Sequence, residues 1–166
     1  MTSEVRDRIV ELVAEAEALI PDHRHPDLPV GVHSKSPEWH SFEHRIWGIG
    51  ELIRQELLKK KSLRKDEELQ RAFARVGCNP FARRGRQSFV MLLEYKCCAG
   101  QAPGIADQLG DQDVAGHAVS TLLKMQAPGY AREIEPFVTA AKAAWVRKTA
   151  RRYVERYGRS GPPERT

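Results

Sequence analysis

The sequence contains little cysteine and no long run of apolar residues. The three cysteines are Cys78, Cys97 and Cys98. An odd number that includes two neighbours does not fit a disulfide framework, because a ring closed between adjacent residues is strained, and it fits a reducing compartment better. No run approaches the ~18 apolar residues of a membrane span, and residues 1–20 mix acids with aliphatics where a signal peptide would be apolar. We therefore expect a soluble, cytoplasmic protein that crosses no membrane.

The motifs of common catalytic sites are also missing. The sequence has no glycine-rich phosphate loop, no Ser–His–Asp order and no paired-carboxylate motif. Cys97 and Cys98 fall late in an expected helix, where nothing favours a thiolate, so a nucleophilic role is not expected. At this length a chain buries roughly 70% of its unfolded surface and needs no structural metal to fold. We expect no cofactor and, apart from a histidine motif described below, no enzyme.

Positive charge is concentrated in two parts of the chain. The formal net charge of +5 combines +7 over residues 59–86 and +5 over residues 144–166 with acidic remainders. Such regions attract anionic partners across a Debye length of ~8 Å in physiological salt, but they also occur on ordinary solvated surfaces. The segments that could contact phosphates are residues 59–65, 83–86 and 147–156.

Apolar residues repeat with helical period in every long stretch. Ser36 is expected to cap the second helix, with Trp39 on its apolar face. Residues 21–36 contain three prolines and a glycine and are predicted to be an extended connection. No stretch has the alternation of a β-strand, so the sequence predicts an all-α fold. In the first part of the chain helices are predicted over residues 3–20, 37–60, 66–76 and 87–98.

A five-residue pattern occurs twice in the second half of the chain. APGIA at residues 102–106 recurs as APGYA at residues 127–131. Each copy is predicted to open a short helix, because proline suits the first helical turn. Each precedes a longer helix, which starts at Val114 in the first copy and at Val146 in the second. A helix pair that cannot bury its own apolar face has to stack on a neighbouring pair.

Over residues 86–158 the chain resembles the HEAT-like repeat family of helical solenoids. The similarity rests on the second-helix pattern V-R-x-x-A, which Val146 to Ala150 match, and on the acidic turn before Val114. Two features depart from the family: Ala115 stands where the family has an arginine, and Pro136 interrupts the first helix of the last pair.

The resemblance implies a curved helical scaffold whose inner face binds a protein, a peptide or nucleic acid. We accordingly expect a short right-handed α-solenoid of HEAT-like helix pairs over residues 62–158. Residues 1–61 would form an N-terminal helical extension packed on the repeats, and residues 159–166 a disordered tail.

The stretch HSFEH at residues 40–44 has the H-x-x-E-H spacing of an inverted zinc-peptidase motif. On a helix, His40 and His44 would lie one turn apart on the same side, with Glu43 beside them. Two imidazoles could then hold zinc while the carboxylate activates water. No third ligand is evident, although a weaker metal site could add a histidine from residues 23–33.

The flank of the helix that carries these histidines is our candidate binding site. His40, His44, Trp47 and Glu51 form a second stripe apart from the apolar stripe. Trp47 offers a flat apolar surface in the groove of a solenoid, and its polar neighbours could orient a ligand. Three basic residues are expected to contact an anionic group of the partner: Arg83, Arg84 and Arg86.

We interpret the chain as a non-enzymatic binding scaffold that recognises a protein or peptide. One alternative is a nucleic-acid-binding protein that uses the basic segments. A second is a metal-binding protein or zinc hydrolase that uses HSFEH. The sequence leaves the oligomeric state and the identity of the partner open.

Overall fold

The computed structural model describes residues 2–159, and it confirms the all-α fold. Within this range the only β-type pairing is an isolated bridge between Val30 and Pro37. Of the predicted tail, residues 160–166 lie outside the described residues. The α-helices are α1 Thr2–Leu19, α2 Ser41–Lys59, α3 Glu67–Gly77, α4 Gln87–Met91, α5 Ala102–Ala106, α6 Ala115–Lys124, α7 Ala131–Ile134, α8 Phe137–Ala140 and α9 Ala144–Tyr157. Short 3₁₀ helices lie between them: η1 Lys61–Lys65, η2 Pro80–Arg86, η3 Lys96–Gln101 and η4 Asp107–Gly110.

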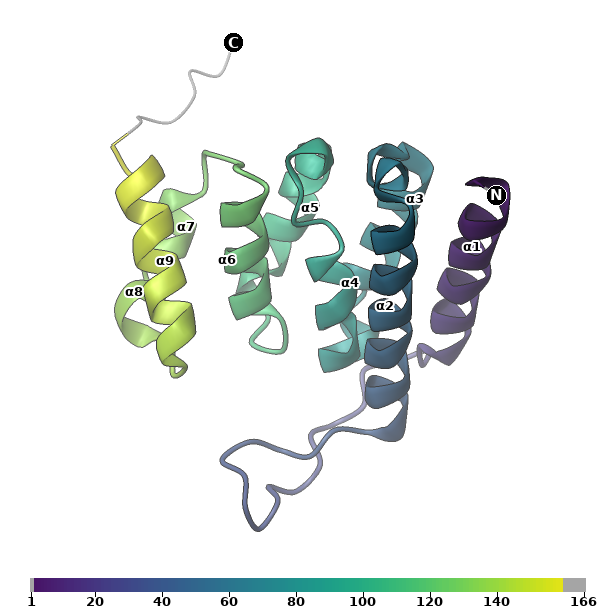
Figure 1. Ribbon diagram of the computed structural model, residues 1–166. Coiled ribbons are helices and arrows are strands. Elements are labelled where there is room, and N and C mark those ends of the chain that lie inside the picture. The colour runs from purple at the N-terminus through teal and green to yellow at the C-terminus, as the bar shows by residue number, and fades with distance from the viewer. Residues whose placement is uncertain (1, 160–166) are drawn as a thin grey trace.

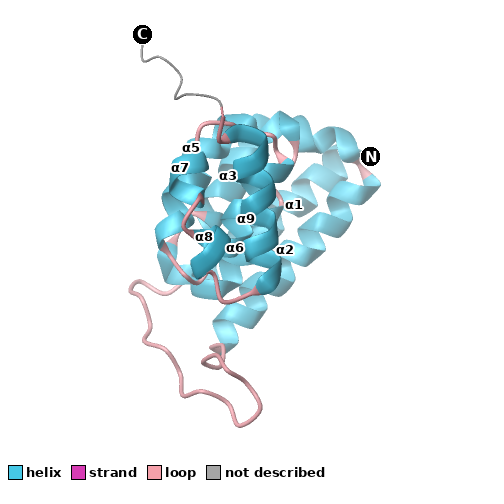
Figure 2. Ribbon diagram, turned by 90° about the vertical axis from the view of Figure 1, so that its left-hand side faces the viewer, coloured by secondary structure: helices cyan, strands magenta, loops and turns pink. Residues whose placement is uncertain are grey.

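The helices stand side by side in the order of the chain, with α1 at one end of the row and α9 at the other (Figure 1). Four of them, α2, α4, α6 and α9, each pack against the next, and we call them the front layer. In a second layer α1 packs against α3, and α3 against α5, while α7 and α8 pack on α9. The connection between α1 and α2 projects beyond the helices as a long loop in both views (Figures 1 and 2).

One continuous hydrophobic core runs along the row. It begins with the inner face of α1, where Ile9 and Ala16 are fully buried, and ends with Tyr153 in α9. The helical period explains this, because packing removes one apolar stripe of each amphipathic helix from water. The Tyr153 hydroxyl donates a hydrogen bond to the carbonyl of Ala127, which joins α9 to the turn after α6.

The second helix begins four residues later than predicted. Residues 37–40 are not helical, and Ser36 is not the cap: α2 starts at Ser41 after an extended His40 with φ −64° and ψ 154°. The carboxylate of Glu43 accepts a hydrogen bond from the His40 N–H at 2.7 Å, which satisfies a donor that the helix leaves free. Trp39, predicted to face the core, is half-buried outside the helix.

Two other predicted helices also differ from the structure. The helix expected over residues 87–98 ends at Met91, and a turn leads into η3. The second copy of the repeated pattern does not open a helix, since Gly129 has φ 105° and α7 starts only at Ala131. A left-handed residue of this kind cannot lie within a right-handed helix. Pro136 separates α7 from α8, as the sequence predicted.

No helix in the described part of the chain has the length and apolar character needed to cross a membrane. The cysteines Cys78, Cys97 and Cys98 are free thiols.

Candidate functional site

The two histidines of HSFEH do not share a helical face. His40 precedes α2, and its Nε2 lies 2.8 Å from the carbonyl oxygen of Pro26 in the long connection. His44 is exposed and stacks on Trp39, with ring centroids 5.1 Å apart. The pair therefore lacks the one-turn arrangement on which the zinc hypothesis depended.

The carboxylate of Glu43 serves the fold. It is fully buried and accepts hydrogen bonds from two backbone N–H groups, that of His40 at 2.7 Å and that of Arg84 at 2.9 Å. In this position the Glu43 carboxylate is engaged by the backbone and does not fit the water-activating role that the zinc-hydrolase hypothesis gave it. Across residues 2–159, no three or more His, Cys, Asp or Glu side chains are grouped so as to hold a metal ion.

The arginines of residues 83–86, which were predicted to contact an anionic partner, point inward. Arg83 is 3% exposed and Arg86 is fully buried. Arg84 is mostly covered, and its Nη1 donates to the carbonyl of Pro37 at 3.1 Å. Buried guanidinium groups have to be paired, because an isolated charge in the interior costs several kcal/mol. The carboxylates that pair with them come from distant parts of the sequence.

Arg86 joins three structural elements. Its Nη1 donates to the carbonyl of Gly77 at 2.9 Å and to Gln108 Oε1 at 2.7 Å, and its Nη2 donates to Asp111 at 2.8 Å. Burial lowers the pKa of Arg86, and the nearby charge of Asp111 offsets part of that effect. Asp111 and Asp113 are the two acids of the turn before Val114. The hydrogen bond from Arg86 therefore ties this acidic turn to the start of α4.

Arg83 and Asp113 form the centre of a buried ionic network. The Nε of Arg83 donates to Asp113 at 3.3 Å, and its Nη1 donates to the carbonyl of His25 at 3.1 Å. Burial alone would lower the pKa of Arg83, but hydrogen bonds to Asp27 and Asp113 outweigh it and raise that pKa. The backbone of Arg83 is left-handed, with φ 51° and ψ −132°, a conformation that costs a non-glycine residue of the order of 1–3 kcal/mol.

The connection between α1 and α2 is attached to this network by two opposite charges. Arg24 donates to Asp111 and to Asp113, each at 2.9 Å, and Asp27 accepts from Arg83. The hydrogen bond from Arg83 lowers the pKa of Asp27. The predicted extended connection is therefore anchored at residues 24–27, while Val32 beyond the anchor is 94% exposed.

Trp47 and Glu51 remain on the surface, as the sequence predicted. Both are half-buried and lie about one turn apart on α2. Glu51 accepts a hydrogen bond from Arg54 at 3.0 Å, and this bond is the main cause of the raised pKa of Arg54. The electrostatic influence of Tyr95 and Glu94, which follow α4 in the chain, adds to that rise in the Arg54 pKa.

Further polar and aromatic groups continue across the front layer. The guanidinium of Arg64 lies over the ring of Tyr95 at 4.1 Å, and Lys124 of α6 pairs with Glu94 at 3.0 Å. At the far end Trp145 of α9 is 48% exposed and meets the ring of His117 edge-on, with centroids 5.4 Å apart. Burial lowers the pKa of His117, so a neutral ring is favoured beside Trp145. We refer to the partly or fully exposed residues Trp47, Glu51, Tyr95, Lys124 and Trp145, which lie on or next to the helices of the front layer, as the front face.

Sequence reasoning missed Tyr95 and Trp145 as site candidates. Trp145 directly precedes the V-R-x-x-A pattern, and this position was a local signal that could have drawn attention to it. Only the structure shows that its ring lies close to Gly116 on α6. A Cβ at Gly116 would lie 2.6 Å from Val146 and 3.1 Å from the Trp145 ring, so α6 and α9 approach closely here. Nothing local indicates that Tyr95 lies beside Arg64.

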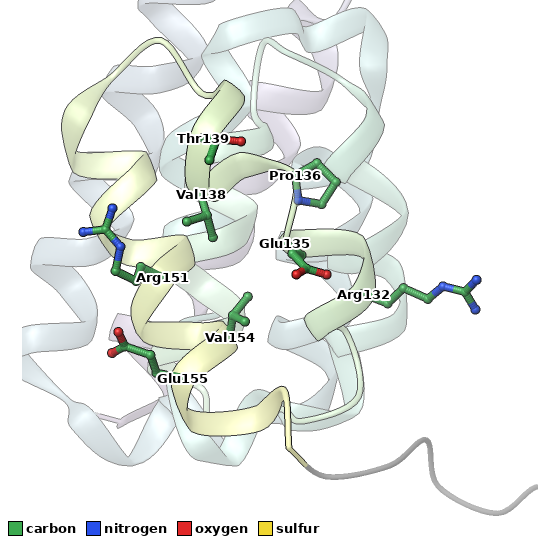
Figure 3. Close-up of a pocket in the computed structure, with 8 residues that line it drawn as sticks. All are labelled: Arg132, Glu135, Pro136, Val138, Thr139, Arg151, Val154 and Glu155. Atoms are coloured by element: carbon green, nitrogen blue, oxygen red, sulfur yellow. The ribbon is translucent and has the colours of Figure 1, made fainter.

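A pocket of about 470 Å³ opens between α7, α8 and α9 (Figure 3). Val138 and Val154 project into the space between α8 and α9, whereas Arg132 extends away from it. The lining contains two acids and two arginines, and it has no histidine or cysteine. The lining residues are Arg132, Glu135, Pro136, Val138, Thr139, Arg151, Val154 and Glu155.

Comparison with models of protein families, with curated proteins and with solved structures finds no match for the chain.

Proposed function

We propose that the chain is a non-enzymatic binding scaffold of the HEAT-like helical-repeat kind, and that its front face recognises a protein or peptide. The observation that carries the proposal is the placement of Trp47, Tyr95 and Trp145. Trp47 lies on α2, Trp145 lies on α9, and Tyr95 lies in the turn between α4 and η3; each is partly or fully exposed.

Aromatic residues surrounded by polar groups are what protein interfaces use. Tryptophan and tyrosine supply large contact areas at low conformational cost, and they are enriched among the residues that dominate binding energy. The front face also contains the pairs Glu51–Arg54 and Glu94–Lys124, which could exchange partners with a ligand. The acidic and basic groups that could have served catalysis near HSFEH are instead engaged in the buried network.

The proposal can be tested without knowing the natural partner. Peptides would be selected from a displayed random library, and the affinity of the best peptide measured by calorimetry. Replacement of Trp145 by Ala is expected to weaken binding at least tenfold. A matched control is Val10→Ala, since Val10 on α1 is also an exposed apolar residue, at 46% compared with 48% for Trp145.

Circular dichroism would confirm that both variants are folded. A photo-cross-linker in the selected peptide should react with α2, α4, α6 or α9. If the library yields no binder, or if binders are unaffected by Trp145→Ala and Trp47→Ala and cross-link elsewhere, the front face is not the recognition surface.

Nucleic acid is the second candidate, and exposed basic side chains favour it. Lys61 and Lys65 of η1 and Arg152 of α9 face solvent. The segment 83–86 does not support it, because its arginines are covered. A phosphate-binding surface should lose affinity for a labelled oligonucleotide steeply between 50 and 200 mM salt, by a factor that grows with the number of phosphates contacted.

A further inference from the structure

Arg64 of η1 carries a guanidinium group that has no acceptor in the described part of the chain. The side chain is half-buried, and its Nε is enclosed without a hydrogen-bond partner. The two Nη groups also have no acceptor, and they are open to solvent. Every other half-buried or buried arginine of residues 2–159 donates to a carboxylate or a carbonyl. A covered cation without an acceptor is costly, so an acceptor from another molecule would satisfy this group.

An aromatic ring supports this guanidinium. Its central carbon lies over the ring of Tyr95, 4.1 Å from the centroid. A guanidinium that meets a ring through its central carbon covers one of its faces and leaves its N–H groups, which lie in its plane, at the edge. A carboxylate is also planar and can accept two parallel N–H bonds from such an edge. The contact with Tyr95 therefore holds Arg64 ready for a carboxylate.

The surroundings of Arg64 are basic. η1 packs against η3, which brings Lys61 and Lys65 of η1 to the same part of the molecule as Lys96 of η3. All three lysines are exposed, and none of them has a carboxylate partner among the described residues. The positive charge of this region is therefore not neutralised within residues 2–159, and it would attract an anionic group toward Arg64.

We propose that Arg64, supported by Tyr95, binds a carboxylate side chain of the partner, and that the partner is accordingly an acidic peptide segment. This inference rests on the proposed function, because it names the chemistry of the peptide that the front face recognises. Tyr95 belongs to that face, and its ring is the contact through which Arg64 joins it.

An acid beside the site favours a peptide over nucleic acid. Glu94 directly precedes Tyr95 and pairs with Lys124 at 3.0 Å. Duplex DNA carries a negative charge every ~1.7 Å along its axis, so a backbone that contacts Arg64 would bring further phosphates close to this carboxylate. A peptide can place one acid on Arg64 and an uncharged residue beside Glu94.

The experiment uses the full chain and the peptides selected from the displayed random library. We expect these peptides to share an Asp or Glu, and replacing that acid with its amide should weaken binding at least about tenfold. Arg64→Gln should weaken binding of the original peptide by a similar factor. It should cause no further loss with the amide peptide, because both changes remove the same contact.

Two variants separate recognition by the guanidinium from general attraction of charge. Arg64→Lys keeps the charge but cannot make two parallel bonds, and it should still weaken binding at least about fivefold. Lys65→Gln is the matched control: it removes one charge from the same short helix and should weaken binding less than about threefold. The Arg64 variants should fold, because the side chain has no hydrogen bond to lose and the Arg64 carbonyl still accepts from Gln70. Circular dichroism checks this, and the amide peptide tests the contact on the unmodified chain.

The outcomes distinguish this inference from the proposed function. Peptides that share no acid, or that bind Arg64→Gln unchanged, would overturn the carboxylate site, and the proposed function would stand if Trp145→Ala still weakened them. Acidic peptides that need Arg64 but neither Trp145 nor Trp47 would keep the carboxylate site and remove the tryptophans from the recognition surface. A library without binders would overturn both. An oligonucleotide that loses affinity in Arg64→Gln, while the selected peptides do not, would assign Arg64 to phosphate instead.

Discussion

Two arginine-rich segments look alike in the sequence and have opposite environments in the structure. Residues 83–86 are packed under the α1–α2 connection, where four carboxylates from three separate parts of the chain neutralise them: Asp27, Glu43, and the neighbouring Asp111 and Asp113. Three arginines of α9, namely Arg151, Arg152 and Arg156, face water. A run of positive charge therefore says little about function until the position of the opposing acids is known, and those acids come from elsewhere in the chain.

The difference has an energetic consequence. An exposed charge is well solvated and contributes little to stability, whereas a buried charge is tolerated only with its partners in place. The segment 83–86 should thus be sensitive to the loss of any one partner, and α9 should be insensitive. Four predictions test this contrast, beginning with the largest effect.

Replacing Arg86 with Ala should destabilise the protein by about 3–5 kcal/mol, because the Gly77 carbonyl, Gln108 and Asp111 lose their shared buried donor and a cavity forms between them; Asp111 keeps only its ion pair with the partly exposed Arg24. Urea unfolding followed by circular dichroism measures this change. The same substitution at Arg152 should shift the free energy of unfolding by less than about 0.5 kcal/mol. Equal effects at the two positions would show that the burial of Arg86 is energetically unimportant.

Acid should weaken the network before it affects α9. Burial by itself would raise the pKa of Asp111, but hydrogen bonds from Arg24 and from the Asp113 N–H, with the charge of Arg86, lower it. A carboxylate with a lowered pKa stabilises the fold above its unfolded value, ~3.9, and that contribution is lost as pH falls through the folded pKa. The urea midpoint should fall below pH ~4, and it should fall less in Asp111→Asn, which starts from a lower stability.

Removing the charge of Arg24 should release the connection without unfolding the helices. Arg24→Gln loses the ion pairs to Asp111 and Asp113 at the surface of the network. Amide hydrogen exchange over residues 21–40 is expected to accelerate several-fold, while exchange in α6 and α9 stays the same. An unchanged rate in residues 21–40 would mean that Asp27 and the backbone contacts are sufficient to hold the connection.

The smallest effect on stability is expected from replacing Arg151, Arg152 and Arg156 together with Gln. The free energy of unfolding should change by less than about 1 kcal/mol, because all three side chains are exposed. The same variant separates the two functional candidates. Binding of an oligonucleotide would lose affinity and show a shallower salt dependence, whereas a peptide selected on the front face would bind unchanged.

The sequence predicted the helices that have long apolar stripes. α1 agrees with its predicted range within about a residue, and α9, predicted to start at Val146, runs from Ala144 to Tyr157. Short elements were predicted poorly: α4 is five residues long, and the chain around Gly129 turns where a helix was expected. In such elements the local preference for a helix is weak, and a single hydrogen bond to a distant residue decides the outcome.

The candidate site was only partly predictable for the same reason. Trp47 and Glu51 could be placed on an exposed flank of α2 from the helical period alone. The positions of His40 and Glu43 could not, because the start of α2 depends on contacts with Pro26 and with Arg84. Tyr95 became a candidate only when the structure placed it beside Arg64.

The sequence by itself determined that this chain is all-helical, because apolar side chains spaced three and four residues apart can leave water together only on a helix. The tertiary structure decided which charges face solvent and which face each other. It buried Arg83 and Arg86 against acids of one turn, and Asp113 of that turn also pairs with Arg24, 89 residues earlier in the chain. It also directed two neighbouring thiols to the carbonyl of Arg64. Charge pairing acts through space between residues far apart in the chain, and local periodicity carries no information about it.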